Sequence, residues 1–330
     1  MKAWQVTEWC EPEAMHWNDV PVPEPGAGQV RIRAHAAALN FFDILQVQGK
    51  YQVKPPFPFT PGAEVSGVVD AVGPGVEAFK LGDRVMAMPH LGGFAELVLA
   101  DVGRTFAMPV SMSFEEAAAF PIVYQTSWCA LVTRTTVRPG ETLLVHAGAS
   151  GVGMSAIQIG KALGAKVIAT AGSDEKLRFS LEIGAHHAVN YSDASWVDKV
   201  KELTGGRGVD IVYDPVGGDT FDLSNKVIAP NGRHLVIGFA SGRIPALAAN
   251  RALLKNMSLV GVFWGGWAAA NPTYMQDTHN VLMEFYAAGK IKPRVASSYP
   301  LAELPRGLRA LADRKILGKT VAVGGFVKEA

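Results

Sequence analysis

Gly148, Gly151 and Gly153 have the spacing of a dinucleotide-binding turn. They lie in residues 142–170, TLLVHAGASGVGMSAIQIGKALGAKVIAT, between two short runs rich in β-branched residues. Such runs are typical of strands, and the segment between them of a turn followed by a helix, so the stretch predicts a parallel β-α-β unit. Glycines let the backbone approach a pyrophosphate, and the helix N-terminus offers N–H donors to it. We expect a bound dinucleotide; the alternative is a turn that serves packing alone.

The residues after the second predicted strand favour NADPH over NADH. A site selective for NAD usually carries Asp or Glu about 20 residues beyond the glycines, where it binds the ribose 2′-hydroxyl. Here that position is Ala171, and Gly172 and Ser173 leave room and a hydroxyl for a 2′-phosphate. Lys176 can reach the phosphate as a positive charge, or it is an exposed helix lysine. The two acidic residues after Ser173 are expected to point to solvent from the first turn of a helix that Ser173 caps.

The elements that position these residues predict two domains. The chain has 330 residues, 48% of them hydrophobic and 18% charged, as in globular proteins. Up to residue 107 the short runs separated by glycine and proline predict a compact antiparallel barrel, with strands near 29–36, 67–72, 83–88 and 94–99. From residue 142 six strands alternate with helices, which predicts a doubly wound parallel sheet with strands near 142–146, 166–170, 188–191, 209–213, 233–237 and 258–263.

Helix signals lie between and after these domains. Ser113 is expected to cap a short helix, Pro121 to open a second one, and residues 274–288 to form a third. The turn FWGGW, residues 263–267, is expected to end the parallel sheet.

Charge and cysteine content exclude several classes of function. The net charge of +1 favours neither nucleic acid nor an anionic membrane as a partner. Cys10 and Cys129 are too few for a disulfide framework. No signal peptide or apolar run of about 18 residues is evident. We expect a soluble, cytoplasmic protein with a small-molecule substrate.

Seven strings of the sequence, in order, resemble the medium-chain dehydrogenase/reductase superfamily, and most closely its zinc-independent quinone oxidoreductases. They are LNFFD (39–43), PGAEVSGVV (61–69), VGPGV (72–76), GDRV (82–85), GGFAE (92–96), VHAGASGVG (145–153) and DPVGG (214–218). The resemblance implies an α/β fold: a GroES-like β-barrel catalytic domain over residues 1–121, a Rossmann domain over 122–265, and a C-terminal segment, 266–330, that returns to the catalytic domain.

The resemblance also implies site residues. Asn40 and Asp43 are expected beside the nicotinamide. Tyr51 is a candidate from its residue type alone, as a proton donor or an oxygen-binding hydroxyl. The expected cofactor-binding residues are Thr126, Ser150, Gly151, Val152, Gly153, Gly172, Ser173, Lys176, Tyr191, Gly238, Phe239, Phe263 and Arg314. Leu45 stands where bacterial relatives carry a tyrosine, which leaves the substrate preference open. The resemblance and the uncharged edge strand SLVGVF, residues 258–263, both predict a homodimer.

No bound metal is expected. Zinc-dependent relatives place a cysteine where this chain has Asn40 and a histidine where it has Ala63, and among the matching positions only Glu64 could be a ligand. Phe42 stands where those enzymes have a proton-relaying hydroxyl. Without a metal to polarise an alcohol, the feasible chemistry is hydride transfer from NADPH to an electron-poor acceptor, such as a quinone or an α,β-unsaturated carbonyl.

Each catalytic candidate has a structural alternative. Asn40 and Asp43 could hold a turn, Tyr51 could be a wall residue, and the Thr126 hydroxyl could bond its own helix backbone. Three functions therefore stay open: an NADPH-dependent quinone or enone reductase, a metal-dependent alcohol dehydrogenase that the missing ligands disfavour, and an NADPH-binding protein without turnover.

Overall fold

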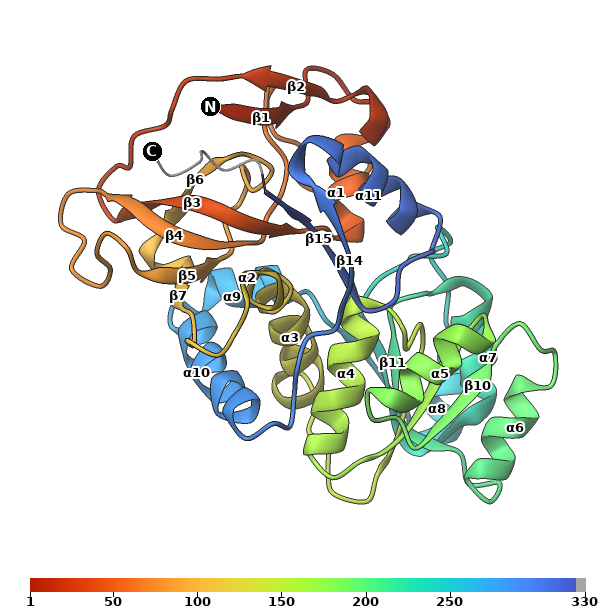
Figure 1. The fold of residues 1–330 in the computed structure, drawn as a ribbon. Coiled ribbons are helices and arrows are strands. Elements are labelled where there is room, and N and C mark those ends of the chain that lie inside the picture. The colour runs from red at the N-terminus through yellow and green to blue at the C-terminus, as the bar shows by residue number, and fades with distance from the viewer. Residues whose placement is uncertain (325–330) are drawn as a thin grey trace. The chain divides into compact units, whose positions relative to one another are not determined.

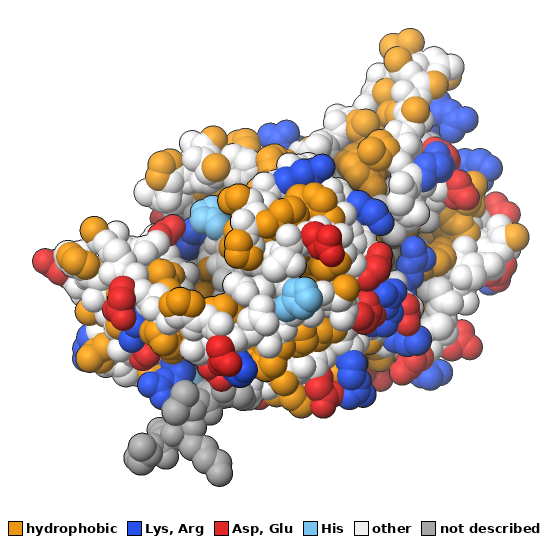
Figure 2. Space-filling model, turned by 90° about the horizontal axis from the view of Figure 1, so that it is seen from above, with side chains coloured by type: hydrophobic (Ala, Val, Ile, Leu, Met, Phe, Trp, Pro, Cys, Tyr) orange, Lys and Arg blue, Asp and Glu red, His pale blue; other side chains and the backbone are white. Residues whose placement is uncertain are grey.

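The computed structural model describes residues 1–324, which form two compact units. The first comprises Met1–Ile122 together with the chain from Pro293 onward, and the second comprises Val123–Lys292. Figure 1 shows the first unit at the red and dark-blue ends of the colour scale and the second mainly in green and light blue. On the face shown in Figure 2, positively and negatively charged side chains are interspersed, in agreement with the net charge of +1.

The first unit is built on a seven-stranded sheet. Its order is β14 (Val295–Pro300), β15 (Lys319–Val323), β3 (Gln29–Ala38), β4 (Val65–Val72), β5 (Arg84–Ala87) and β7 (Thr105–Ala107), with β6 (Leu97–Asp101) also pairing β3. All pairs are antiparallel except β14 with β15. A separate hairpin joins β1 (Lys2–Gln5) to β2 (His16–Asp19). The mainly antiparallel β-domain predicted from the sequence is confirmed.

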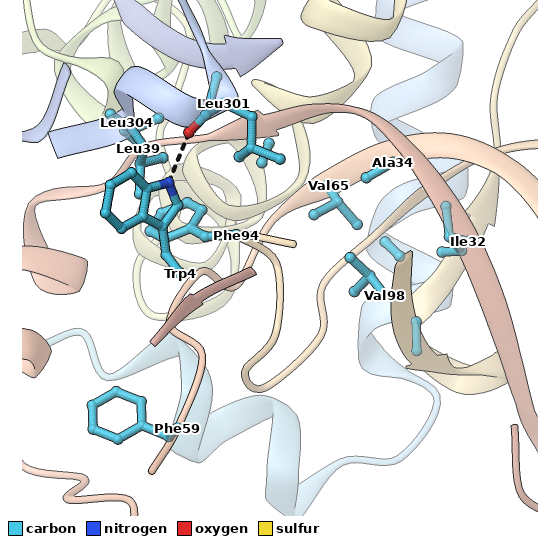
Figure 3. Close-up of a cluster of buried hydrophobic side chains, with 14 of the residues drawn as sticks. Trp4, Ile32, Ala34, Leu39, Phe59, Val65, Phe94, Val98, Leu301 and Leu304 are labelled. Atoms are coloured by element: carbon cyan, nitrogen blue, oxygen red, sulfur yellow. Dashed lines mark hydrogen bonds between the residues drawn. The ribbon is translucent and has the colours of Figure 1, made fainter. Parts of the chain in front are cut away.

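Alternating side chains of this sheet form a hydrophobic core. Along β3, Val30, Ile32, Ala34 and Ala36 are buried at every second position, as expected for a strand with one face in the core. Trp4 and Phe94 lie in the same core with three leucines: Leu301 from a 3-10 turn (Leu301–Glu303), and Leu304 and Leu308 from α11 (Leu304–Ala312). The Trp4 indole N–H donates to the Leu301 carbonyl at 2.7 Å (Figure 3).

The second unit is a doubly wound α/β domain, as predicted. Its six strands are all parallel, in the order β10 (His187–Asn190), β9 (Lys166–Ala171), β8 (Thr142–Val145), β11 (Val209–Asp214), β12 (Ile228–Val236) and β13 (Ser258–Gly261). The helices between them are α4 (Gly151–Ala162), α5 (Asp174–Glu182), α6 (Trp196–Leu203), α7 (Gly218–Val227) and α8 (Ala249–Lys255). The last strand ends at Gly261, and the expected turn at 263–267 instead opens helix α9 (Trp264–Ala270).

Two further helices begin where Ser113 and Pro121 predict. Ser113 caps α2 (Phe114–Ala118) by accepting the Glu116 N–H at 3.2 Å, and Pro121 opens α3 (Pro121–Trp128), which continues as a π-helical turn, Cys129–Thr133. Helix α1 (Phe41–Val47) follows β3. No helix in the described part of the chain is long and apolar enough to cross a membrane.

Residues 266–292, which the sequence assigned to the returning segment, lie in the second unit. Helix α10 (Tyr274–Ala287) is held there by two contacts with the region of α3. The Tyr274 hydroxyl lies 2.9 Å from the Thr133 hydroxyl, and the Gln125 amide donates to the Met275 carbonyl. The segment that returns to the first unit therefore begins at Pro293.

Replacing Phe94 with alanine should destabilise the first unit strongly. Phe94 is fully buried, so Phe94→Ala leaves a cavity that costs about 3–5 kcal/mol in the free energy of unfolding. Phe57→Ala is the matched control, because the Phe57 side chain is 42% exposed and its loss leaves little cavity. Urea unfolding followed by tryptophan fluorescence measures both variants. Equal losses for the two would contradict the assigned core.

Candidate active site

The predicted cofactor residues of the second unit gather at the carboxyl ends of its strands. Strand β8 lies between β9 and β11. From β8 the chain first adds β9 and β10 on one side, and then crosses to add β11, β12 and β13 on the other, so the direction of strand addition reverses between β8 and β11. In open parallel sheets, ligands bind outside the strand ends at such a reversal. The loop after β8, residues 146–150, and the loop after β11, residues 215–217, are at this point.

The glycine-rich turn after β8 is shaped by protein contacts. Ser150 caps α4 by accepting the Gly153 N–H at 3.1 Å. A Cβ on Gly153 would lie 2.2 Å from the Ala147 carbonyl oxygen, and a Cβ on Gly148 would lie 2.9 Å from the Ala169 Cβ. Ala147 itself has a left-handed backbone, φ 49°. Glycine is therefore required at 148 and 153 for close packing of the turn, which brings the start of α4 directly to the end of β8.

A buried hydroxyl network positions Thr126 beside this turn. The neighbouring Ser127 hydroxyl donates to the Val152 carbonyl at 3.2 Å and lies 2.7 Å from the Ser155 hydroxyl and 2.9 Å from that of Tyr213. The Thr126 hydroxyl has no hydrogen-bond partner among residues 1–324, so the alternative of a bond to its own helix backbone does not occur in this structure.

The residues predicted to bind a 2′-phosphate meet at the ends of β9 and β10. In the pairing of these strands Asn190 lies opposite Ala171, which makes Tyr191 and Gly172 neighbours. A Cβ on Gly172 would lie 3.2 Å from the Tyr191 ring and from its hydroxyl, so a larger residue at 172 would crowd this tyrosine. Ser173 caps α5, on whose first turn Lys176 lies.

The first turn of α5 carries two acidic residues, which the sequence predicts to point toward solvent. Asp174 and Glu175 are both exposed, as expected for first-turn residues whose charge favours the helix N-terminus. Lys176 is half-buried and is the basic residue of this turn.

The other predicted cofactor residues divide between the units. Gly238 and Phe239 lie in the loop after β12, which hydrogen-bonds to the loop after β11 through Ala240 N–H to the Pro215 carbonyl. Phe263 follows β13, is 68% exposed and precedes α9. Arg314 lies in the first unit after α11 and has a left-handed backbone, φ 59°.

In the first unit, Asn40 lies between two buried charges. Its side-chain oxygen accepts from the Lys319 ammonium at 2.7 Å, and its Nδ2 donates to the Glu64 carboxylate at 3.1 Å. Lys319 and Glu64 also form an ion pair at 3.0 Å, with side chains 3% and 0% exposed. We call Asn40, Glu64 and Lys319 the Asn40 cluster.

Sequence reasoning singled out Glu64 only as a possible metal ligand and missed Lys319. The available signal was a lysine at the start of an apolar strand, KTVAV, since a lysine is almost never fully buried without a partner. Among the described residues, no group of three or more His, Cys, Asp or Glu side chains has the arrangement of a metal site.

One carboxylate oxygen of Asp43 holds the start of α1, and burial of the carboxyl raises its pKa. Its Oδ2 accepts the Asn40 backbone N–H at 2.8 Å at the start of α1, which is the turn-holding role considered as an alternative. Its other oxygen, Oδ1, is buried and has no hydrogen-bond partner within residues 1–324. Burial raises the pKa of Asp43 to about 7, against the opposing effects of the Asn40 N–H and the Lys319 charge.

Tyr51 lies near Asp43. Its ring packs on that of Phe42 with centroids 5.5 Å apart, and its backbone N–H donates to the Leu45 carbonyl. Burial raises the pKa of Tyr51, and the negative charge of Asp43 raises it further. Asn40 and Asp43 therefore lie at the start of α1, where a carboxyl can hold a proton near neutral pH, and Tyr51, which follows the helix, packs its ring on Phe42 of the same first turn.

Two family models match most of this architecture. The alcohol dehydrogenase GroES-like domain matches residues 26–110, and the zinc-binding dehydrogenase domain matches residues 151–280. The quinone oxidoreductase-like protein 2 of Bos taurus is 39% identical over 89% of this chain and 84% of its own length.

Solved structures agree with these matches. Escherichia coli quinone oxidoreductase in complex with NADPH has a TM-score of 0.92 at 30% identity and covers 98% of this chain and 100% of its own. A mycobacterial protein complexed with NADPH has the same TM-score at 34% identity, with 98% and 100% coverage. The chain therefore belongs to the medium-chain dehydrogenase/reductase superfamily, and within it to the zinc-independent quinone oxidoreductase branch.

Proposed function

We propose that this protein is an NADPH-dependent oxidoreductase that reduces a quinone or an α,β-unsaturated carbonyl without a metal. The observation that carries the proposal is the gathering of Gly172, Ser173, Lys176 and Tyr191 at the ends of β9 and β10. Similarity to quinone oxidoreductases and to two proteins with NADPH in their structures supports it.

The residues at the second unit's strand ends fit NADPH. Gly172 leaves the Tyr191 ring and hydroxyl uncrowded by a Cβ, and Lys176 supplies a positive charge on the first turn of α5. A phosphate there would be held by a hydroxyl, an ammonium and the N-terminus of α5. In place of the carboxylate of an NAD-selective site the chain has Ala171, which is buried and cannot bind a ribose hydroxyl.

The first unit supplies groups for the acceptor. When bound, NADPH supplies the hydride. Of the two N–H groups of the Asn40 amide, the described contacts use one, for Glu64, and the other can donate to an acceptor oxygen on which negative charge develops. Asp43, in its protonated form, supplies the proton that neutralises that oxygen, with Tyr51 beside it.

An exposed apolar edge supports a homodimer. Strand β13 is the last of its sheet and pairs only β12 among the described strands. Leu259 of this strand is 49% exposed, and Leu253 and Leu254 of the preceding helix α8 are 74% and 80% exposed. We propose that two copies pair along this edge, which would cover the apolar side chains and the unpaired backbone groups.

The first test follows NADPH oxidation with quinones, enones and enoyl thioesters in the presence of a strong chelator. We expect turnover with NADPH and a preference over NADH of about ten- to a hundredfold, the value of one charge-assisted contact. Lys176→Ala should lose most of that preference, whereas Lys199→Ala, on α6, should keep it. No turnover with any acceptor would favour an NADPH-binding protein without catalysis. Activity that is lost on chelation and restored by zinc would contradict the metal-free mechanism.

A second prediction concerns the proton. If protonated Asp43 is the donor, kcat falls as the pH rises through about 7. Asp43→Asn keeps an oxygen for the Asn40 N–H but cannot donate a proton, so kcat should fall about 10²- to 10⁴-fold and lose this pH dependence. The Tyr51→Phe variant should keep the pH dependence. A wild-type profile in Asp43→Asn would exclude Asp43 as the donor.

The same carboxyl makes stability depend on pH. Its pKa is raised in the folded protein from an ordinary value of 3.8 to about 7, so the folded state holds the proton more tightly. Its contribution to stability is therefore complete below pH 4 and is lost as the pH rises through about 7. Glu64, Lys319 and Tyr51 are the ionisable groups that face it. Asp43→Asn should remove this part of the pH dependence in urea unfolding.

The dimer is tested by sedimentation velocity at micromolar concentration. We expect a dimer for the wild type and a shift toward monomer for Leu259→Lys, which places a charge on the proposed pairing edge. Leu81→Lys is the control, since Leu81 is 63% exposed but lies in the first unit. A monomeric wild-type protein would contradict the interface.

A further inference from the structure

The Asn40 side chain is held between one group that can only donate hydrogen bonds and one that can only accept them. The Lys319 ammonium donates to Oδ1 at 2.7 Å, and the Glu64 carboxylate accepts from Nδ2 at 3.1 Å. Between neutral partners an amide can turn end for end with little cost. Between these two charges the reversed orientation would place an acceptor against a carboxylate and a donor against an ammonium, so one orientation is fixed.

The charges are themselves held firmly. Lys319 is buried and uses three hydrogen bonds, to the Leu39 carbonyl at 3.2 Å, to Asn40 at 2.7 Å and to Glu64 at 3.0 Å. The second Glu64 oxygen accepts the Ile122 N–H at 2.7 Å. An ammonium has three N–H donors, so Lys319 has none left for a substrate. Its effect on a reaction must pass through Asn40.

Strand pairing explains why Lys319 stands at this place. Strand β15 pairs antiparallel to β3, with Val321 opposite Ala38, and the Leu39 N–H donates to the Thr320 carbonyl. Extending this register by two residues places Lys319 opposite Asn40. On the other side of β3, the Ala38 N–H donates to the Glu64 carbonyl, just before β4 begins. Asn40, two residues after the end of β3, is therefore flanked by both charges.

We propose that Lys319 is a positioning residue of the reductase site, which fixes the Asn40 amide so that its remaining N–H is presented to the acceptor oxygen. This inference rests on the proposed function. It predicts that loss of Lys319 lowers turnover through the orientation of Asn40, with little change in NADPH binding.

The decisive variant is the double substitution Lys319→Met/Glu64→Gln. Removing both charges avoids an unpaired buried charge, which would unfold the protein for unrelated reasons. A glutamine at 64 can donate or accept, so both orientations of the Asn40 amide become possible. We expect kcat to fall about ten- to a hundredfold, with the KM for NADPH within about twofold of wild type. Lys315→Met is the matched control, because its side chain is 71% exposed, and it should leave both constants unchanged.

A readout without cofactor or substrate separates this inference from the proposed function. In protein labelled with ¹⁵N-asparagine, the Asn40 side-chain amide is assigned by its loss in Asn40→Ala. We expect two distinct resonances in the wild type and exchange broadening in the double variant. An unchanged Asn40 signal, or wild-type kcat in the double variant, would overturn the inference. Wild-type protein without reductase activity would overturn the proposed function, while the spectral comparison would still test Lys319.

A second variant keeps the test decisive if the double variant does not fold. Lys319→Gln/Glu64→Gln also removes both charges, and its two amides can still donate and accept hydrogen bonds in the buried cluster. Its Asn40 amide is no longer held by an ammonium, so we again expect exchange broadening and a fall in kcat. Sharp Asn40 resonances with wild-type kcat in this variant would show that the lysine does not fix the amide.

Discussion

The ion pair between Lys319 and Glu64 is the interaction on which the polar interior of the first unit depends. Both side chains are buried, and taking two charges out of water is favourable only when their remaining hydrogen bonds are made. Here the backbone of residues 39 and 122 and the side chain of Asn40 make them. Removing one partner of such a pair typically lowers the free energy of unfolding by about 3–5 kcal/mol, because the other charge stays buried without a partner.

This requirement joins distant parts of the sequence. Lys319 belongs to β15, Glu64 precedes β4, and Asn40 follows β3, so the three strands must pair in one register for the cluster to exist. The part of the chain that follows the second unit is therefore needed to complete the interior of the first. Asp43 lies one helical turn further on and, because Lys319 and Glu64 influence it in opposite directions, burial dominates its pKa.

The two units contribute different chemistry. The second offers backbone, a hydroxyl and one ammonium at the ends of parallel strands, which suits an anionic dinucleotide. The first offers an oriented amide and a carboxyl that holds a proton near neutral pH, which suit an acceptor that gains negative charge. Asp43 must be kept from water to hold its proton, and its buried Oδ1, which has no hydrogen-bond partner among residues 1–324, carries the energetic cost of that burial.

The sequence by itself determined the local structure and the nature of the cofactor site. Strand and helix periodicity, the Ser113 and Ser173 caps and the glycine turn are local signals, and they predicted the parallel sheet and its helices closely. Ala171 and Gly172 pointed to NADPH because their positions follow directly from the preceding strand. The strand 258–263 was predicted two residues too long, since its last residues cap a helix.

Only the tertiary structure decided the surroundings of Asn40. The pairing of β15 with β3 joins residues about 280 positions apart, and no local pattern encodes such a contact. For the same reason the sequence could not show that Gly172 faces Tyr191, that residues 266–292 pack in the second unit, or that Asp43 is buried deeply enough to keep a proton at neutral pH. The pKa of a group depends on the charges and hydrogen bonds around it and on how far it is removed from water, and only the complete fold sets these surroundings.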